Sequence, residues 1–426
     1  MRAIRRTRAN STEKRTHKMA SRRVYFAVFG SGLGHVSRVL EIASRVRRSG
    51  DEFRFSCSGQ AMDFLRSHGE ASSLLESPSF DVDWTEEGSV SSKSFIPRFP
   101  HMFNTFLKQL ALERQNVSRF DPDVVVSDSR LSPILAARAR SVPIVTMLNQ
   151  FKVGFPPRFS GKGVGRAYER FAGDVLGLLW SLSDEVLMTD LPPPYTIGAA
   201  NLEGTDVSRV VRYVGFTSPP ARPSEESVRS VKASLGLDGR PLVFFQISGP
   251  DVTKRPFVET VLRSTGDLCR TCNVVISMGH PNASGEPMML SSGARLYDWC
   301  PVKDELFSLS SVVVARAGHG TIGQCIDAGR PAVLVPIHNH SEQIGNADKF
   351  SKLGLGIEIR SERLTKETLT EAVEACLGDP RYRQSVEKVR EVSLRYNGVE
   401  RCAEIIDSYA RPLGGGAGRR EAPQML

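Results

Sequence analysis

The sequence predicts an α/β protein built from two doubly wound, parallel-sheet domains, and three observations carry this prediction. The chain has 426 residues, which is too many for one ordinary hydrophobic core. Short apolar runs alternate with helical spacing twice along the chain, an order that is typical of parallel sheets. A stretch that contains Pro219, Pro220 and Pro223 separates the two runs and indicates an interdomain linker.

Each run predicts its elements in chain order. The first predicts a strand at 24–29, a helix at 35–48, strands at 53–57 and 124–126, a helix at about 131–140 and a strand at 144–148. The second predicts strands at 242–247, 274–277, 312–315 and 332–335 with helices between them, and then an all-helical end from 365 to about 410. Two similar halves followed by helices therefore make up the body of the chain.

The charge of the chain is concentrated at its ends. The formal net charge is +9, but residues 1–23 hold nine Lys or Arg with one Glu, and residues 411–426 hold three Arg with one Glu. The body between them is close to neutral, which argues against a nucleic-acid enzyme, since such enzymes carry a basic patch on the folded domain. The basic N-terminal end lacks the apolar stretch of a secretory signal, so a tether to an anionic surface and a start codon upstream of Met19 both stay open.

The other bulk features indicate a cytoplasmic protein. Seven cysteines are scattered along the chain, and their odd number argues against a disulfide-stapled secreted fold. Cys269 and Cys272 form a lone CxxC, which we interpret as a helix end before a strand. No run reaches the ~18 apolar residues of a membrane span.

A glycine-rich turn, Gly30 to Gly34, joins the first predicted strand to the first helix and leads directly to His35. Its glycines run GxGxG rather than GxGxxG, and the second strand ends in Cys57 and Ser58 without the acidic residue of a dinucleotide site. A tight turn alone needs no histidine. We therefore expect His35 to act as a general base above the carboxyl edge of the sheet, with a buried structural histidine as the alternative.

An acidic residue, Asp128, follows the apolar strand at 124–126 and is expected at the same edge. A carboxylate beside His35 would fix its tautomer and stabilise its imidazolium form, as in a His–Asp dyad. The alternative is that Asp128 caps the helix that begins near Ser132 and Pro133.

The segment from 311 to 347 carries the most specific pattern in the chain. An apolar strand leads into a helix through the turn Gly318-His319-Gly320-Thr321. Glycines let the backbone approach a ligand, N–H groups at a helix N-terminus attract phosphate, and His319 can donate to a phosphate oxygen. After the next strand, Glu342 and Gln343 offer hydrogen bonds suited to sugar hydroxyls. The pattern predicts the donor site of a nucleotide-sugar enzyme.

In three segments the chain resembles bacterial and archaeal glycosyltransferases related to the UDP-N-acetylglucosamine transferase that makes lipid II. These segments are 32–38, 126–130 with Asn149 and Gln150, and 248–347. The resemblance implies a GT-B fold, in which two Rossmann-like domains face each other across a cleft and the last helix crosses back to the first domain. The expected parts are a basic disordered tail at 1–21, an acceptor-binding domain at 22–216, a linker at 217–226, a donor-binding domain at 227–395, the crossing helix at 396–411 and a flexible tail at 412–426.

The resemblance also implies roles for single residues. Ser248 and Gly249 with a following basic side chain would approach the donor diphosphate, and the backbone near Cys300 would hold the base. The expected donor-side residues are Ser248, Gly249, Lys254, Arg255, Cys300, Val302, Arg316, Gly318, His319, Gly320, Thr321, Gln324, Glu342, Gln343 and Asn346. The expected acceptor-side residues are Gly32, Gly34, Arg38, Arg130, Asn149 and Gln150.

One position departs from the family pattern. Where the family usually has a glutamate that binds both ribose hydroxyls, this chain has Gln324. An amide accepts one hydrogen bond and donates another, so ribose binding is kept while nucleotides other than uridine stay open.

These features together predict an inverting, metal-independent glycosyltransferase without a cofactor. His35 would deprotonate a hydroxyl acceptor, which attacks the anomeric carbon of a UDP-sugar, with N-acetylglucosamine expected first and a hexose second. No acidic pair of the DxD kind stands in a phosphate-proximal loop, so a helix N-terminus and basic side chains would neutralise the leaving diphosphate. A UDP-sugar epimerase or hydrolase of the same fold, and a non-catalytic nucleotide-sugar-binding module, are the alternatives.

Two stretches of the first half mix apolar and basic residues. They are 94–103 with Phe106, Leu107 and Lys108, and 151–159. Such surfaces suit contact with an anionic membrane and a lipid-linked acceptor, which would place the enzyme on the inner face of the membrane. The alternative is that they are loops folded onto their own domain.

Overall fold

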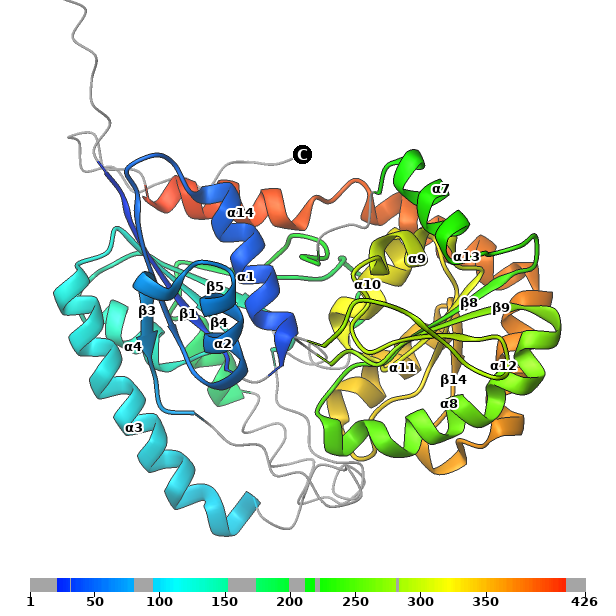
Figure 1. Cartoon of the computed structure of the whole chain (residues 1–426). Coiled ribbons are helices and arrows are strands. Elements are labelled where there is room, and N and C mark those ends of the chain that lie inside the picture. Colours follow the sequence, from blue (N-terminus) through cyan, green and yellow to red (C-terminus); the bar gives the residue numbers. More distant parts are fainter. Residues whose placement is uncertain are drawn as a thin grey trace, which may run out of the picture.

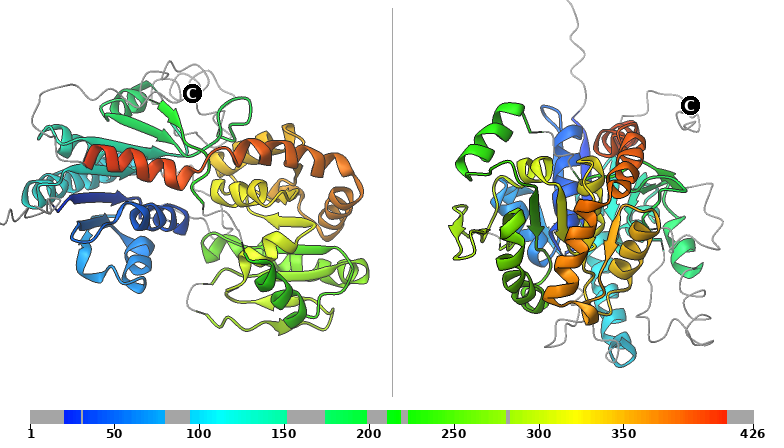
Figure 2. Two further views of the ribbon diagram at one scale, coloured as in Figure 1. Left: turned by 90° about the horizontal axis from the view of Figure 1, so that it is seen from above. Right: turned by 90° about the vertical axis from the view of Figure 1, so that its right-hand side faces the viewer.

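The computed structural model describes residues 21–30, 32–79, 95–151, 174–198, 211–218, 223–280 and 283–410, and for 95–99 the backbone alone. Two α/β domains lie side by side, joined by chain segments between them (Figures 1 and 2). The predicted two-domain parallel-sheet architecture is confirmed. Every helix in the described ranges is too short or too polar to span a bilayer.

The N-terminal domain is a parallel sheet flanked by helices. Its described strands lie in the order β3-β2-β1-β4-β5-β6-β7, and every neighbouring pair is parallel. Central strands of such a sheet are covered on both faces, which explains why they read as continuous apolar runs. The bounds are β1 (Arg23–Val28), α1 (Leu33–Val46), β2 (Glu52–Cys57), α2 (Gly59–Ser67), β3 (Leu74–Glu76), α3 (Phe95–Phe120), β4 (Val124–Asp128), α4 (Ser132–Arg138), β5 (Ile144–Leu148), β6 (Glu185–Met188) and β7 (Val211–Tyr213).

The C-terminal domain repeats this plan with one antiparallel edge. Its described strands lie in the order β10-β11-β9-β8-β12-β13-β14, and the β10–β11 pair is the antiparallel one. The bounds are α7 (Glu225–Ser234), β8 (Leu242–Gln246), α8 (Asp251–Thr271), β9 (Asn273–Ser277), β10 (Met288–Met289), β11 (Arg295–Tyr297), α9 (Lys303–Leu309), β12 (Val312–Ala315), α10 (His319–Asp327), β13 (Ala332–Leu334), α11 (Ser341–Lys352), β14 (Gly356–Glu358), α12 (Lys366–Gly378) and α13 (Pro380–Ser393).

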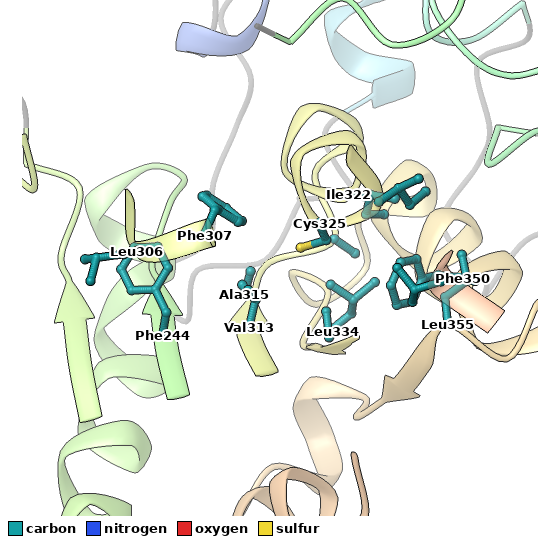
Figure 3. Close-up of a cluster of buried hydrophobic side chains, with 14 of the residues drawn as sticks. Phe244, Leu306, Phe307, Val313, Ala315, Ile322, Cys325, Leu334, Phe350 and Leu355 are labelled. Atoms are coloured by element: carbon teal, nitrogen blue, oxygen red, sulfur yellow. The ribbon is translucent and has the colours of Figure 1, made fainter. Parts of the chain in front are cut away.

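One face of this second sheet forms the core that supports the predicted donor turn (Figure 3). Phe244 of β8 meets Phe307 of α9 edge to face, with ring centroids 5.5 Å apart. On the other side of the same cluster, Ile322 and Cys325 of α10 and Leu334 of β13 are fully buried. Because α10 is anchored by these side chains, its first turn is held at the carboxyl end of β12.

The last helix, α14 (Gly398–Ala410), leaves the C-terminal domain and packs on the N-terminal one. Figure 2 shows it lying along the first domain after α13. Its Cys402 and Ile406 join the cluster that contains Ile42 of α1. At its far end Asp407 pairs with the buried Arg22 before β1. The expected crossing-back of the last helix is therefore observed.

The segment 95–108 differs from its interpretation as a loop. It forms the first half of α3, so the loop interpretation is wrong there. Proline is tolerated in the first turn of a helix, where its missing N–H has no intrahelical partner, and Pro97 lies in that turn. Of the second stretch, 151–159, only Phe151 lies within the described residues, and it is buried.

Candidate active site

The start of α1 is set by the turn that follows β1. Gly32 precedes the helix with φ 80°, a left-handed conformation that glycine adopts without strain. Gly30 lies so close to the next loop that an added Cβ would be 2.8 Å from the carbonyl oxygen of Ser58. Both glycines let the chain turn tightly above the sheet and place His35 in the first turn of α1, whose beginning faces the other domain (Figure 1).

His35 and Asp128 are brought together as predicted. The Nδ1 atom of His35 lies 2.8 Å from Oδ1 of Asp128, which is the last residue of β4 and is fully buried. Strands β1 and β4 are neighbours, so the residues that follow or end them share one edge. The capping alternative fails, because the N-cap of α4 is Leu131 and no side chain caps that helix end.

Arg38 completes this cluster. One turn after His35, it donates from Nε to Oδ2 of Asp128 at 2.6 Å and from Nη2 to Oδ1. Its Nη1 donates to the Asn149 side chain and, at 3.1 Å, to Thr189. Arg38 and Asn149 were expected on the acceptor side; in the structure the contacts of both run inward, to the carboxylate and to each other.

The charges in this cluster keep the Asp128 carboxylate ionised and decide which ring nitrogen of His35 carries the proton. Burial alone would raise the pKa of Asp128, but the charges of Arg38 and His35 and their hydrogen bonds outweigh it and hold this pKa far below its usual value. An ionised carboxylate only accepts hydrogen bonds, so Nδ1 of His35 carries a proton toward it. The lone pair of the neutral ring is then on Nε2, and the His35 side chain is 23% exposed. A general base needs this arrangement.

Arg130, the next predicted acceptor residue, is part of a separate buried network. It donates to Glu113 of α3 at 2.6 Å and to the backbone oxygen of Ser56 at 2.9 Å. Tyr25 donates to the same Glu113 carboxylate at 2.6 Å. Arg130 therefore fixes the loop after Asp128 from below, and its partner Glu113 was missed because α3 was not predicted.

The other acceptor-side positions surround the same turn. Gly32 and Gly34 are exposed at the start of α1. The side-chain nitrogen of Gln150, after β5, is buried and has no hydrogen-bond partner among the described residues. An amide nitrogen in this state can still donate to a bound molecule.

In the C-terminal domain, Gly318 is the N-cap of α10 and no side chain caps this helix. The first helical hydrogen bond runs from the N–H of Ile322 to the carbonyl of Gly318 at 3.0 Å. The N–H groups of His319, Gly320 and Thr321 therefore have no intrahelical acceptor and carry the positive end of the helix dipole. Such an end accommodates an anionic group.

The basic residues expected at the diphosphate have different surroundings. Arg316 is buried and donates to the carbonyls of Val335 (3.1 Å) and Thr253 (2.6 Å), and burial lowers its pKa to about 10. Lys254 is buried as well and donates to the carbonyl of Gly279 at 3.0 Å. Arg255 is exposed on α8. Arg316 and Lys254 thus tie loops together near the turn.

Of the remaining donor-side residues, Ser248 and Gly249 follow β8, and Cys300 and Val302 lie between β11 and α9. Gly249 has φ 104°, which favours glycine, and follows the partly exposed Ser248. Burial raises the pKa of Cys300 to about 12, so its thiol stays neutral, and Val302 caps α9.

Helix α11 carries the predicted sugar contacts. Gln343 accepts the N–H of Ile337 at 3.0 Å, and Asn346 donates to the carbonyl of Ala317 at 3.2 Å. The first bond ties α11 to the loop that precedes it, and the second holds α11 against the turn before α10. Glu342 is partly exposed in the first turn of α11, and Gln324 is partly exposed on α10.

In the part of the chain that the structure describes, no three His, Cys, Asp or Glu side chains are placed to hold a metal ion. Two further residues beside the site, Thr189 and Asp190, follow β6. Sequence reasoning missed them because β6 was not recognised; an acid directly after an apolar run was the signal available.

Comparison with known proteins agrees with this architecture. Residues 252–401 match the family model of the glycosyltransferase family 28 C-terminal domain, and residues 22–155 match that of glycosyl transferase family 1. An uncharacterized glycosyltransferase of Methanosarcina acetivorans is 24% identical over 90% of this chain and 98% of its own length. A PGL/p-HBAD biosynthesis glycosyltransferase of Mycobacterium tuberculosis is 24% identical over 87% of this chain and 88% of its own.

Solved structures with this fold are also glycosyltransferases. The glycotransferase of kitacinnamycin superposes with a TM-score of 0.63 at 16% identity, over 92% of this chain and 99% of that one. The calicheamicin glycosyltransferase CalG4 gives 0.62 at 18% identity, over 92% and 98%. These likenesses show the GT-B fold.

Proposed function

We propose that this chain, a glycosyltransferase of the GT-B type, transfers a sugar from a UDP-sugar to a hydroxyl acceptor with inversion and without a metal ion. The sugar is N-acetylglucosamine or a hexose. The observation that carries the proposal is the contact of His35 Nδ1 with the buried Asp128 carboxylate at 2.8 Å. It leaves Nε2 of a partly exposed histidine as the base at the sheet edge where open α/β sheets bind ligands.

The reaction follows from this base. Nε2 of His35 takes the proton of the acceptor hydroxyl as its oxygen forms a bond to the anomeric carbon. The bond from that carbon to the diphosphate oxygen breaks, and the nucleoside diphosphate leaves with the electron pair. Attack from the face opposite the leaving group inverts the anomeric configuration. Asp128 stabilises the imidazolium that forms.

The donor end is assigned to α10 and α11. Three N–H groups without intrahelical acceptors at the start of α10 suit the developing charge of the diphosphate. Glu342 is partly exposed at the start of α11, and we assign it to the sugar hydroxyls of the donor. Gln324 is the position that decides between uridine and another nucleoside, since it replaces the ribose-binding glutamate of the resembled family.

A lipid-linked acceptor is supported by α3. Phe103 and Leu107 are 52% and 46% exposed on this helix. Exposed apolar side chains of this kind suit contact with a membrane surface. We therefore place the enzyme in the cytoplasm, at the inner face of the membrane. Sedimentation with anionic vesicles that weakens in a Phe103→Ser, Leu107→Ser variant supports this part, and equal sedimentation of both proteins contradicts it.

The test begins with nucleotide binding. Purified protein is titrated calorimetrically with UDP, GDP, dTDP and UDP-N-acetylglucosamine, and its melting temperature is recorded with each, since a ligand of the native state raises it. Release of UDP from UDP-N-acetylglucosamine and UDP-glucose is then measured with and without lipid extracts and soluble alcohols, in EDTA. Release that needs no acceptor would favour the hydrolase or epimerase alternative.

The variants His35→Ala and Asp128→Asn test the mechanism. His35→Ala removes the general base and should lower kcat by about 10²–10⁴-fold. Asp128→Asn removes the charge that stabilises the imidazolium and should lower kcat as well, while UDP affinity stays near that of the wild type in both variants. His68→Ala, at an exposed histidine that ends α2, is the matched control. Full activity of His35→Ala contradicts the mechanism, and donor binding without turnover in the wild type would indicate a binding module.

A further inference from the structure

A contact between the two domains lies directly beside the donor turn. His319, the first residue of α10, is 6% exposed, and its Nε2 lies 3.0 Å from Oδ2 of Asp190. Asp190 is fully buried and follows β6 in the N-terminal domain. The two atoms are at ion-pair distance, although the ring N–H is not aligned for a hydrogen bond. The reaction described above makes no use of Asp190.

The Asp190 carboxylate is fixed by the backbone that follows it. Oδ1 accepts the N–H of Leu191 at 2.7 Å and that of Ile197 at 3.2 Å, and Oδ2 accepts the N–H of Gly198 at 2.9 Å. Three donors offset the cost of burying the carboxylate. Because all three belong to one loop of the N-terminal domain, Asp190 moves with that domain and not with α10.

The surroundings of His319 leave one ring nitrogen for a ligand. The Phe216 ring packs on the imidazole with centroids 5.4 Å apart. Among the described residues, Asp190 is the one charged side chain within ion-pair distance of His319, and no hydrogen bond of Nδ1 is formed. Tyr213 is a further titratable group that is affected by the Asp190 charge: burial, with a smaller effect of that charge, raises the pKa of Tyr213, so its phenol is neutral near pH 7.

We infer that Asp190 is a positioning residue for the donor diphosphate: it holds His319 through Nε2, so that Nδ1 donates to a phosphate oxygen at the start of α10. The inference rests on the proposed function, because it requires a nucleoside diphosphate at this turn. An imidazole between a carboxylate and a phosphate carries a proton on each nitrogen, and its positive charge then stabilises the leaving group. Since the carboxylate belongs to the other domain, this contribution depends on the two domains being in contact.

The experiment compares UDP with uridine as probes. Asp190→Asn keeps the size of the side chain and one acceptor oxygen for the loop. At pH 8 we expect its dissociation constant for UDP to rise about tenfold, which corresponds to about one unit of protonation equilibrium, while that for uridine is unchanged. The difference should shrink at pH 6, because acid favours the doubly protonated form of an imidazole even without a carboxylate partner. His319→Gln should show the same loss, and the double variant no further loss.

The matched control is Asp267→Asn. It removes a carboxylate of α8 that forms an ion pair with Lys366. His319→Gln leaves the Asp190 loop intact, so it tests the inference even where Asp190→Asn folds poorly. Unchanged UDP affinity in both variants, an equal loss for UDP and uridine, or additive losses in the double variant overturns the inference alone. A wild type that binds neither UDP, GDP nor dTDP overturns the proposed function, and the inference with it.

Discussion

At the scale of single residues, the buried Asp128 carboxylate accepts hydrogen bonds from both His35 and Arg38. His35 and Asp128 could be paired in advance because each follows or ends a predicted strand at one sheet edge. Arg38 and Arg130 have the same residue type and similar loop positions, and both were assigned to the acceptor. In the structure one shares the Asp128 carboxylate and the other is buried against Glu113. Local sequence does not state which arginine meets a carboxylate 90 residues away and which meets one 17 residues away.

Arg38 should set the pH range in which His35 works as a base. Its charge is one of the causes that hold the pKa of Asp128 low and it neutralises that carboxylate. In Arg38→Gln the Asp128 charge is left to His35 alone, which favours the protonated ring. The acidic limb of kcat/KM should therefore move to higher pH by about one unit.

The measurement is the pH profile of kcat/KM for the variant and for Arg45→Gln, which alters an exposed arginine on the same helix. An unmoved acidic limb with a raised KM for the acceptor would instead favour the acceptor-binding role predicted from the sequence.

At the scale of elements, continuous apolar strands were predictable and short or interrupted ones were not. Strands β4, β5, β8 and β12 have buried apolar runs that no other element explains. The strands β3, β7 and β14 have three residues each and are mostly half-buried, so they show no continuous buried apolar run, and they were missed. Helix α3 was missed because its prolines suggest a loop, although it packs over the sheet and supplies Glu113 to the network below the site.

Helix α3 should depend on that network for its attachment. Glu113 is fully buried and accepts from Tyr25, Ser56 and Arg130, each at 2.6 Å. Glu113→Ala leaves Arg130 buried without its carboxylate, which costs about 3–5 kcal/mol. Unfolding in urea should show this loss, and Glu41→Ala, at a surface pair with Arg45, should show less than about 1 kcal/mol. Equal stability of the two variants would mean that water reaches Arg130 and that α3 is held by its apolar contacts.

At the scale of the whole molecule, two chain segments join the domains and pass each other closely. Residues 214–218 lead out of the first domain, and residues 394–397 lead back to it and end at Gly398, the first residue of α14. Gly215, with φ 91°, lies against Tyr396. A Cβ added to Gly215 would be 2.5 Å from the Cβ of Tyr396. The repeated α/β order predicted both domains, but the closeness of this crossing depends on how they are docked, which local sequence does not determine.

The place where residues 214–218 pass the start of α14 should tolerate no side chain at Gly398. A Cβ there would lie 2.2 Å from the carbonyl oxygen of Phe216 and 2.7 Å from that of Gly215, both backbone atoms that cannot rotate away. Gly398→Ala must separate the two segments, and overpacking of this kind costs about 1–3 kcal/mol. Phe216 also packs on His319, so the displacement reaches the donor turn. We expect a lower melting temperature and a lower kcat/KM for the donor.

Gly378→Ala, at the end of α12 where an added Cβ meets nothing within 4 Å, should melt like the wild type. If the two variants melt and turn over alike, the crossing has room to adjust, and the docking of the domains is set by α14 on α1 instead.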